Sequence, residues 1–410
     1  MIADEPGRIR TLDLIRGVAV LGILAVNIAS FAAPAGATYS PNLPEPGSQA
    51  DNWAYGFTLV FFEGKMRALF SILFGASLLL FIERREAQGR DGEALQVRRL
   101  AWLALFGWLH FVLLWDGDVL FLYACMGLGA LLMRRTPPGQ LVILALPLFL
   151  VWQAWGIASW APTVALESQV AEGTATPQQR TEYAGIVAEN RHEDREDREI
   201  TLSSYGHEMA SRQADHPAYP LAVLSTIWGE TLTYVMIGMA LLGSGFFAAA
   251  WPRRRLALLG WGGTAAGLAA TLAFAAWAQP RGYPEMAMHL AIGYLLSLPH
   301  LLTALGYAAL LVLAAPRLLA TRLGQRIEAA GRMAFSNYLG TTFVMCAIFY
   351  GWGLGLFAGY GAAGQWLFVL LGWALMLGWS KWWLARFRQG PLEWLWRSLA
   401  EWQLLPNRKP

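Results

Sequence analysis

The chain has 410 residues, of which 56% are hydrophobic and only 14% are charged, and its formal net charge is +3. This composition excludes an ordinary soluble domain, in which about a quarter of the residues are charged. The two cysteines, Cys125 and Cys346, both fall inside apolar runs. They therefore predict neither a disulfide framework nor a thiolate metal site. The sequence also gives no indication of a nucleic-acid partner.

Apolar runs of about 20 residues, the length that crosses a bilayer core, recur along the chain. They predict an all-α polytopic membrane protein with about ten transmembrane helices. Five helices fall in residues 1–160, a long outer loop covers 161–219, and the last five helices with a tail occupy 220–410. The predicted spans are 12–33, 55–82, 99–116, 118–133, 140–160, 221–249, 256–278, 290–315, 332–351 and 364–385.

The distribution of basic residues predicts the orientation in the membrane. Short outer loops hold almost no lysine or arginine, with Arg281 alone in 279–289. The segments predicted to lie inside hold Arg8, Arg10, Arg84, Arg85, Arg98, Arg99, Arg134, Arg135, Arg253, Arg254, Arg255, Arg317, Arg322, Arg326, Arg386, Arg388 and Lys409. The positive-inside rule then places both termini in the cytoplasm. We expect a multi-pass protein of the bacterial plasma (inner) membrane, with a homodimer left open.

The long loop 161–219 contains a run, 192–199, that mixes acidic and basic residues at helical spacing. This pattern is typical of a solvated helix with ion pairs along its surface. A metal site built from His192, His207 and His216 is the weaker interpretation. We expect no metal.

A histidine, His110, stands in an apolar run that ends in Asp116 and Asp118. An ionisable group at membrane depth is costly and is therefore a functional-site hypothesis by default. About eleven residues separate His110 from Arg99, which places the imidazole near the membrane midplane. The two carboxylates are expected at the outer mouth. Spacing alone does not make either one the partner of His110.

Three charged residues, Glu63, Lys65 and Arg67, lie in the predicted second span. Glu63 and Arg67 are four residues apart and share a helix face, with the acid first. Together with Asn27 and Glu230, these residues are expected to form one polar layer. Glu230 has no basic neighbour in sequence and needs a partner from another helix. A structural ion pair that locks two helices is the alternative interpretation of this group.

The two observations combine into one expected arrangement. We predict that His110 is a buried base that faces Glu63, Lys65 and Arg67, while Asp116 and Asp118 guard the outer entrance. A second histidine, His300, lies at similar depth after Pro299. Because side chains near a proline can serve the freed backbone carbonyl, we rank His300 below His110.

At the inner side, Asp13 and Arg16 lie three residues apart at the start of the first span. They are typical of a structural pair at the membrane interface. With Arg98, Arg99 and Arg332 they could also form a basic mouth for an anionic ligand.

Several motifs resemble those of the YeiB-like membrane proteins over nearly the whole chain except 161–219. The motifs are Leu12-Asp13-x-x-Arg16-Gly17 with Asn27, Glu63-Gly64-Lys65-x-Arg67, Gly107 with His110, Trp115-x-Gly117-Asp118, Gly331-Arg332-Met333-Ala334 with Asn337-Tyr338-Leu339, and the tail Gly390-Pro391-Leu392-Glu393-Trp394-Leu395-Trp396-Arg397. That family in turn resembles the transmembrane acyltransferase superfamily. The Leu-Asp-x-x-Arg-Gly opening is shared with the acyltransferase-3 enzymes, which acylate exported carbohydrates. The heparan-α-glucosaminide N-acetyltransferases, which use cytosolic acetyl-CoA, share it too.

The resemblance also has two departures. The position of Asn27 is typically a catalytic histidine in acyltransferase-3 proteins, whereas an asparagine matches the N-acetyltransferase branch. That branch has a histidine just after the first span, and this sequence has none between Asn27 and His110. His110 is therefore the available imidazole.

The resemblance implies acyl transfer from a cytoplasmic donor, acyl-CoA, to an outer hydroxyl or amine such as that of a carbohydrate. His110 is then the expected general base. Asp118 or Glu63 would orient it, and Asn27, Lys65 or Arg67 would stabilise the oxyanion. The wider set of expected substrate-binding residues also contains Asp116, Asp13, Arg16, Arg332, Asn337 and Tyr338. A proton-coupled transporter of a small molecule or lipid, with the same charged layer as its site, is the alternative.

Overall fold

The computed structural model describes residues 8–215 and 217–409, and within these ranges every regular element is a helix. His216, of the weaker metal interpretation, lies outside them. The α-helices are α1 (Arg10–Ala32), α2 (Gln49–Phe61), α3 (Lys65–Glu86), α4 (Gly92–Leu113), α5 (Leu120–Leu131), α6 (Pro138–Ala171), α7 (Pro177–Thr201), α8 (Tyr205–Asp215), α9 (Tyr219–Gly243), α10 (Arg253–Ala257), α11 (Thr264–Ala278), α12 (Glu285–Leu290), α13 (Ser297–Leu318), α14 (Arg322–Arg332), α15 (Ala334–Phe349), α16 (Ala362–Arg386) and α17 (Pro391–Glu401).

The helices confirm the expected all-α membrane architecture. Seven helical stretches of the described chain are long and apolar enough to cross a bilayer, and α5 and α15 are shorter apolar helices. Each of the ten predicted spans coincides with one of these helices, with α4, or with a consecutive set of helices. The protein is therefore a multi-pass helical membrane protein, while the number of ten crossings remains a prediction.

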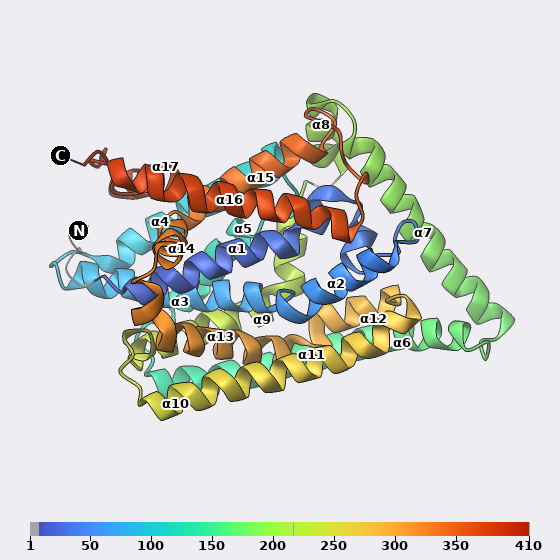
Figure 1. The fold of residues 1–410 in the computed structure, drawn as a ribbon, viewed down its shortest axis with the longest axis horizontal. Coiled ribbons are helices and arrows are strands. Elements are labelled where there is room, and N and C mark those ends of the chain that lie inside the picture. The colour runs from blue at the N-terminus through green and yellow to red at the C-terminus, as the bar shows by residue number, and fades with distance from the viewer. Residues whose placement is uncertain (1–7, 216, 410) are drawn as a thin grey trace.

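Most helices run along the long axis of the molecule (Figure 1). The start of α1 and the tail helix α17 lie at one end, and α7 with α8 lies at the other. We call these the terminal end and the loop end. Both described ends of the chain therefore lie on the same side of the bundle.

Glycines allow the central helices to touch backbone to backbone. A Cβ at Gly75 of α3 would lie 2.0 Å from the Val235 carbonyl oxygen of α9, and one at Gly238 would lie 1.9 Å from that of Ile72. Small residues at such crossings are the usual means of tight packing in membranes, where water exclusion does not drive helices together. Gly17 on α1 packs in the same way against α14, so α1, α3, α9 and α14 form a closely packed centre.

The predicted second span is not one continuous helix. The chain leaves helical geometry between α2 and α3, where Gly64 has φ +68°. Only a residue without a Cβ adopts this conformation readily. Glu63 and Arg67 therefore do not share a helix face, and the prediction based on their spacing is wrong.

The charged run 192–199 lies within α7, which confirms the predicted helix. This helix is more than a solvated surface, because Asp194 is 4% exposed and accepts a hydrogen bond from the Gly36 amide at 3.0 Å. Arg191 also forms an ion pair with Glu285 at 2.9 Å. These contacts fix the loop helix against the loop end of the bundle.

Candidate functional site

The break between α2 and α3 is capped by its own charged residues. Glu63 accepts a hydrogen bond from the Gly64 amide at 3.0 Å, and the fully buried Lys65 donates to the Leu59 carbonyl oxygen at 2.7 Å. The carboxylate thus lies at the start of α3 and the ammonium at the end of α2, where the helix dipoles favour each charge. The histidine beside this break is His300, because a Cβ at Gly64 would lie 1.8 Å from its Nδ1.

Arg67 forms its ion pair with Glu230 of α9, at 3.2 Å, and not with Glu63. Glu230 is 2% exposed and also accepts a hydrogen bond from the Tyr234 hydroxyl at 2.6 Å. The expectation that Glu230 needs a partner from another helix is confirmed. This group connects α3 and α9, which is the structural role considered for the layer.

His110, near the end of α4, pairs with Asp118 through Nδ1 and Oδ1 at 2.8 Å. The other carboxylate oxygen accepts from the Phe121 amide at the start of α5 at 3.0 Å. Because an ionised carboxylate can only accept, Nδ1 donates to Asp118, and in a neutral imidazole Nε2 then carries the lone pair. Nε2 is buried without a hydrogen-bond partner in the described part of the chain.

This geometry corrects the arrangement expected from the sequence. His110 faces Asp118, not Glu63, Lys65 and Arg67. Asp118 is 3% exposed and does not guard an entrance, whereas Asp116, two residues earlier, is exposed. The chain turns back through Gly117, which brings Asp118 beside His110 although the two are eight residues apart. Their contact closes the α4–α5 hairpin.

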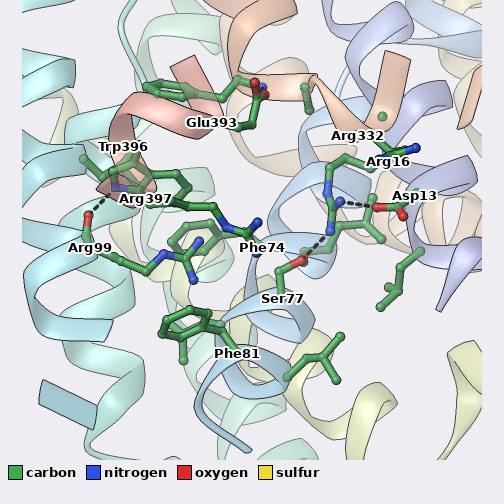
Figure 2. Close-up of a pocket in the computed structure, with 18 of the residues that line it drawn as sticks. Asp13, Arg16, Phe74, Ser77, Phe81, Arg99, Arg332, Glu393, Trp396 and Arg397 are labelled. Carbon is green, nitrogen blue, oxygen red and sulfur yellow. Dashed lines mark hydrogen bonds and ion pairs between the residues drawn. The ribbon is translucent and has the colours of Figure 1, made fainter. Parts of the chain in front are cut away.

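A cavity of about 570 Å³ opens at the terminal end, between α1, α3, α4, α14 and α17. Two carboxylates line it, Asp13 and Glu393, against eight arginines: Arg8, Arg16, Arg84, Arg85, Arg99, Arg332, Arg388 and Arg397. We call this the basic cavity. Figure 2 shows Arg16, Arg99 and Arg397 reaching into the same space from three different helices. Such a density of guanidinium groups is suited to phosphate groups.

Asp13, Arg16 and Arg332 lie on this cavity as the sequence suggested. Asp13 pairs with both Arg8 and Arg16, at 2.6 and 2.7 Å, so one carboxylate serves two cations. The arrangement leaves an excess of positive charge on the walls, which an anionic ligand would balance.

Of the two neighbouring arginines on α4, only Arg99 lines the basic cavity. Its guanidinium lies 4.0 Å from the Phe81 ring centroid and 4.3 Å from that of Trp396. Arg98 is exposed and outside the lining, so its expected place at the basic mouth is wrong. Substitutions of Arg99 and Arg98 therefore provide a matched comparison of an arginine inside the cavity with one outside it.

The tail helix α17 forms one wall of the cavity, which the sequence reasoning missed. Glu393 accepts hydrogen bonds from the Phe335 and Ser336 amides at the start of α15, and Trp396 donates to the Arg99 carbonyl oxygen at 2.7 Å. Arg85 and Arg90 both pair with Glu401. The tail motif of the family resemblance was the available signal for Glu393, Trp396 and Arg397.

The deep part of the basic cavity is apolar, with Ile23, Phe70, Leu103 and Val119 among its lining residues. Tyr338 also lines it, and its ring centroid lies 5.5 Å from that of His110. The cavity thus runs from arginines at its mouth to the neighbourhood of a buried histidine.

Two further expected binding residues lie outside this cavity. Asn337 donates to Ala330 and Ser380 and accepts from the Trp379 indole at 2.7 Å, so its amide is used for helix packing. Asn27 is half-buried and does not line the basic cavity.

A second cavity, of about 340 Å³, opens at the loop end between α1, α2 and the segment 358–366. Its charged lining residues are Glu45, Asp51, Glu63 and Arg198. We call it the acidic cavity. On α1 it reaches Ala25 and Val26, whereas the basic cavity reaches Ile23. The two cavities, of opposite charge, therefore approach each other at mid-depth.

These features define a multi-pass helical membrane protein with a ligand-sized cavity at each end. Over 95% of both chains it is 32% identical to the uncharacterized protein YeiB of Escherichia coli K12. It is 31% identical to the uncharacterized protein YxaH of Bacillus subtilis 168, over 98% of this chain and 96% of the relative. Residues 241–403 match the family described as a protein of unknown function, DUF418. The chain therefore belongs to the YeiB-like family. No solved structure matches it.

Proposed function

We propose that this protein is a membrane acyltransferase that takes an acyl group from acyl-CoA in the basic cavity and passes it to a hydroxyl or amine acceptor. The observation that carries the proposal is the lining of the cavity: arginines at the mouth, apolar side chains in the depth, and Tyr338, whose ring contacts His110. A ligand with an anionic group at one end and an apolar group at the other matches this lining. Phosphates would bind the guanidinium groups and the acyl chain would lie among the apolar residues.

The His110–Asp118 pair would supply the base. Asp118 holds the tautomer in which Nε2 can accept a proton, and it stabilises the imidazolium that results. His110 would remove the acceptor's proton as the new bond to the acyl carbon forms. It would then return that proton to the departing thiolate as the carbon–sulfur bond breaks.

A structural role is the competing explanation of the pair, because it also closes the α4–α5 hairpin. The unpartnered Nε2 favours chemistry, since buried polar atoms of a purely structural pair are normally satisfied. The Trp115 indole nitrogen is also buried without a hydrogen-bond partner in the described chain. The ring centroids of Trp115 and His110 are 6.1 Å apart. A ligand between the two groups would satisfy both.

The proposal includes an orientation. Ten crossings with both termini in the cytoplasm would open the basic cavity to cytosolic acyl-CoA and the acidic cavity to the outside. The distribution of arginines supports this placement in a bacterial inner membrane.

The test is acyl transfer from radiolabelled acetyl-CoA by the purified protein in nanodiscs, with D-glucosamine or D-glucose as acceptor. His110→Ala should abolish transfer, and Asp118→Asn should lower the rate by at least about 100-fold. Both variants break a buried pair and should lower the thermal unfolding temperature, so unchanged CoA binding at the assay temperature is the control that shows that the fold is retained. Undiminished transfer by His110→Ala would refute the assignment of the base.

A transporter is the second candidate, because the two cavities open at opposite ends and approach each other on α1, next to a broken helix. Broken helices with buried charges are a feature of secondary transporters. Flux of a solute into liposomes without any acyl donor would favour this function over the first.

A further inference from the structure

The acidic cavity differs from the basic cavity in charge, and its deepest charged group is Glu63. Glu63 is 9% exposed and lines the cavity. One oxygen, Oε1, accepts the Gly64 amide, and in the described chain no group donates to Oε2. No cation lies within 4 Å of this carboxylate among those residues, since Arg67 pairs with Glu230 and Lys65 donates to a backbone carbonyl.

The other carboxylates of the cavity differ from Glu63. Asp51 accepts from the Ser48 and Ala363 amides and caps α2, so its oxygens are engaged. Glu45 and Arg198 are exposed at the rim. Glu63 is thus the one deep charged group lining this cavity, in the described chain, that still has acceptor capacity.

A buried carboxylate is costly unless hydrogen-bond donors and positive charge compensate it. Lys65 and Arg67 interact with Glu63 electrostatically, without a direct ion pair or hydrogen bond among the described residues. A ligand that brings a protonated amine to Oε2 would supply both a donor and a charge. An anionic ligand would meet repulsion from three carboxylates against one arginine.

The rest of the wall suits a small polyhydroxyl group. Trp366 lines the cavity with its indole nitrogen on the Thr58 hydroxyl at 3.2 Å, and Tyr55 and Tyr360 add two further rings. Aromatic faces beside hydrogen-bonding groups can contact the apolar face of a sugar ring while its hydroxyls are satisfied.

We infer that the acidic cavity binds a cationic amino sugar or a similar aminopolyol, with Glu63 as its anionic anchor. The binding chemistry follows from the cavity itself. The role of that ligand as the acyl acceptor rests on the proposed function.

The test uses equilibrium binding of radiolabelled D-glucosamine to the full-length protein in nanodiscs, with D-glucose and D-glucuronate as competitors. Glucosamine should bind, glucose should compete at least tenfold more weakly, and glucuronate should not compete. Glu63→Gln, which keeps the shape of the side chain, should weaken glucosamine binding at least tenfold. Glu182→Gln removes the same charge from the exposed surface of α7, outside the cavity, and should change binding less than about threefold.

A second variant guards against a fold defect. Ala29→Phe fills the acidic cavity from α1 without changing its charge, and it should weaken glucosamine and glucose binding alike. CoA binding at the basic cavity should be unchanged in all three variants and reports on the fold. Glucosamine binding that is absent from the wild type, or insensitive to both Glu63→Gln and Ala29→Phe, would overturn the inference.

The same samples separate this inference from the proposed function. Glucosamine that binds through Glu63 but is never acylated would refute acyl transfer to it while leaving the site in place. Acyl transfer to another acceptor, with unchanged kinetics in Glu63→Gln, would support the acyltransferase and reject this site.

Discussion

The Arg67–Glu230 pair predicts a large and asymmetric stability effect. Removing one partner of a buried pair typically costs about 3–5 kcal/mol, because the other charge remains buried. The Glu230 side chain is 2% exposed and that of Arg67 is 30% exposed. We therefore expect Arg67→Met, which strands the deeper charge, to cost about 5 kcal/mol, and Glu230→Gln to cost about 3 kcal/mol. The double variant should cost less than the sum.

The assay is unfolding in mixed micelles as the fraction of denaturing detergent is raised, followed by circular dichroism, and arranged as a double-mutant cycle. Glu86→Gln is the control, because Glu86 pairs with Arg134 at 2.9 Å but is 46% exposed. That change should cost less than about 1 kcal/mol. Additive losses, or losses at Arg67 and Glu230 no larger than the control, would refute the view that this pair holds α3 to α9.

Three further predictions follow from the site and its surroundings. Arg99→Gln should weaken CoA binding at least about tenfold, since a charge-assisted contact contributes about 1.5–3 kcal/mol, while Arg98→Gln should stay within about threefold in the same titration. Gly64→Ala should lower the thermal unfolding temperature, because φ +68° is costly for alanine and the new methyl group would clash with His300. The same substitution in a His300→Ala background should lose less. An unchanged unfolding temperature in Gly64→Ala would contradict the reasoning. Burial, with Asp116 second, raises the pKa of Asp197 on α7 to about 7. Between these pH values the folded protein holds a proton on Asp197 that the unfolded chain has lost. The free energy of unfolding should therefore fall as the pH rises from about 4 to about 7, by on the order of 1–2 kcal/mol for this partly exposed group. Asp197→Asn should flatten the pH profile of thermal unfolding.

The sequence could predict the features that depend on local pattern. The apolar runs mark the membrane helices, and mixed charges at helical spacing mark α7. The unpaired acid at Glu230 correctly indicates a partner on another helix. The physical causes are lipid exposure, ion pairing along a helix surface and the cost of a buried charge. Each can be recognised from the residue types and their spacing.

Features that depend on tertiary packing could not be obtained in this way. Nothing local in Phe62-Glu63-Gly64 distinguishes a helix break from a tolerated membrane glycine, and the break is specified by the Lys65 cap and by His300 on a distant helix. The His110–Asp118 pair needed the turn through Gly117 to be known. Spacing on a straight helix could therefore not decide between Asp118 and Glu63, and the structure selects Asp118.

The wall that α17 contributes to the basic cavity has a consequence for biosynthesis. This helix follows in chain order every helix that it touches, and its Trp396 and Glu401 reach back to α4 and α3. The membrane bundle can thus be inserted before the site exists. A ribosome that stalls before residue 390 would leave an inserted protein with an unfinished, open cavity. A bulky group fused after Lys409 would be placed beside the mouth of the basic cavity, which Arg388 and Gln389 line.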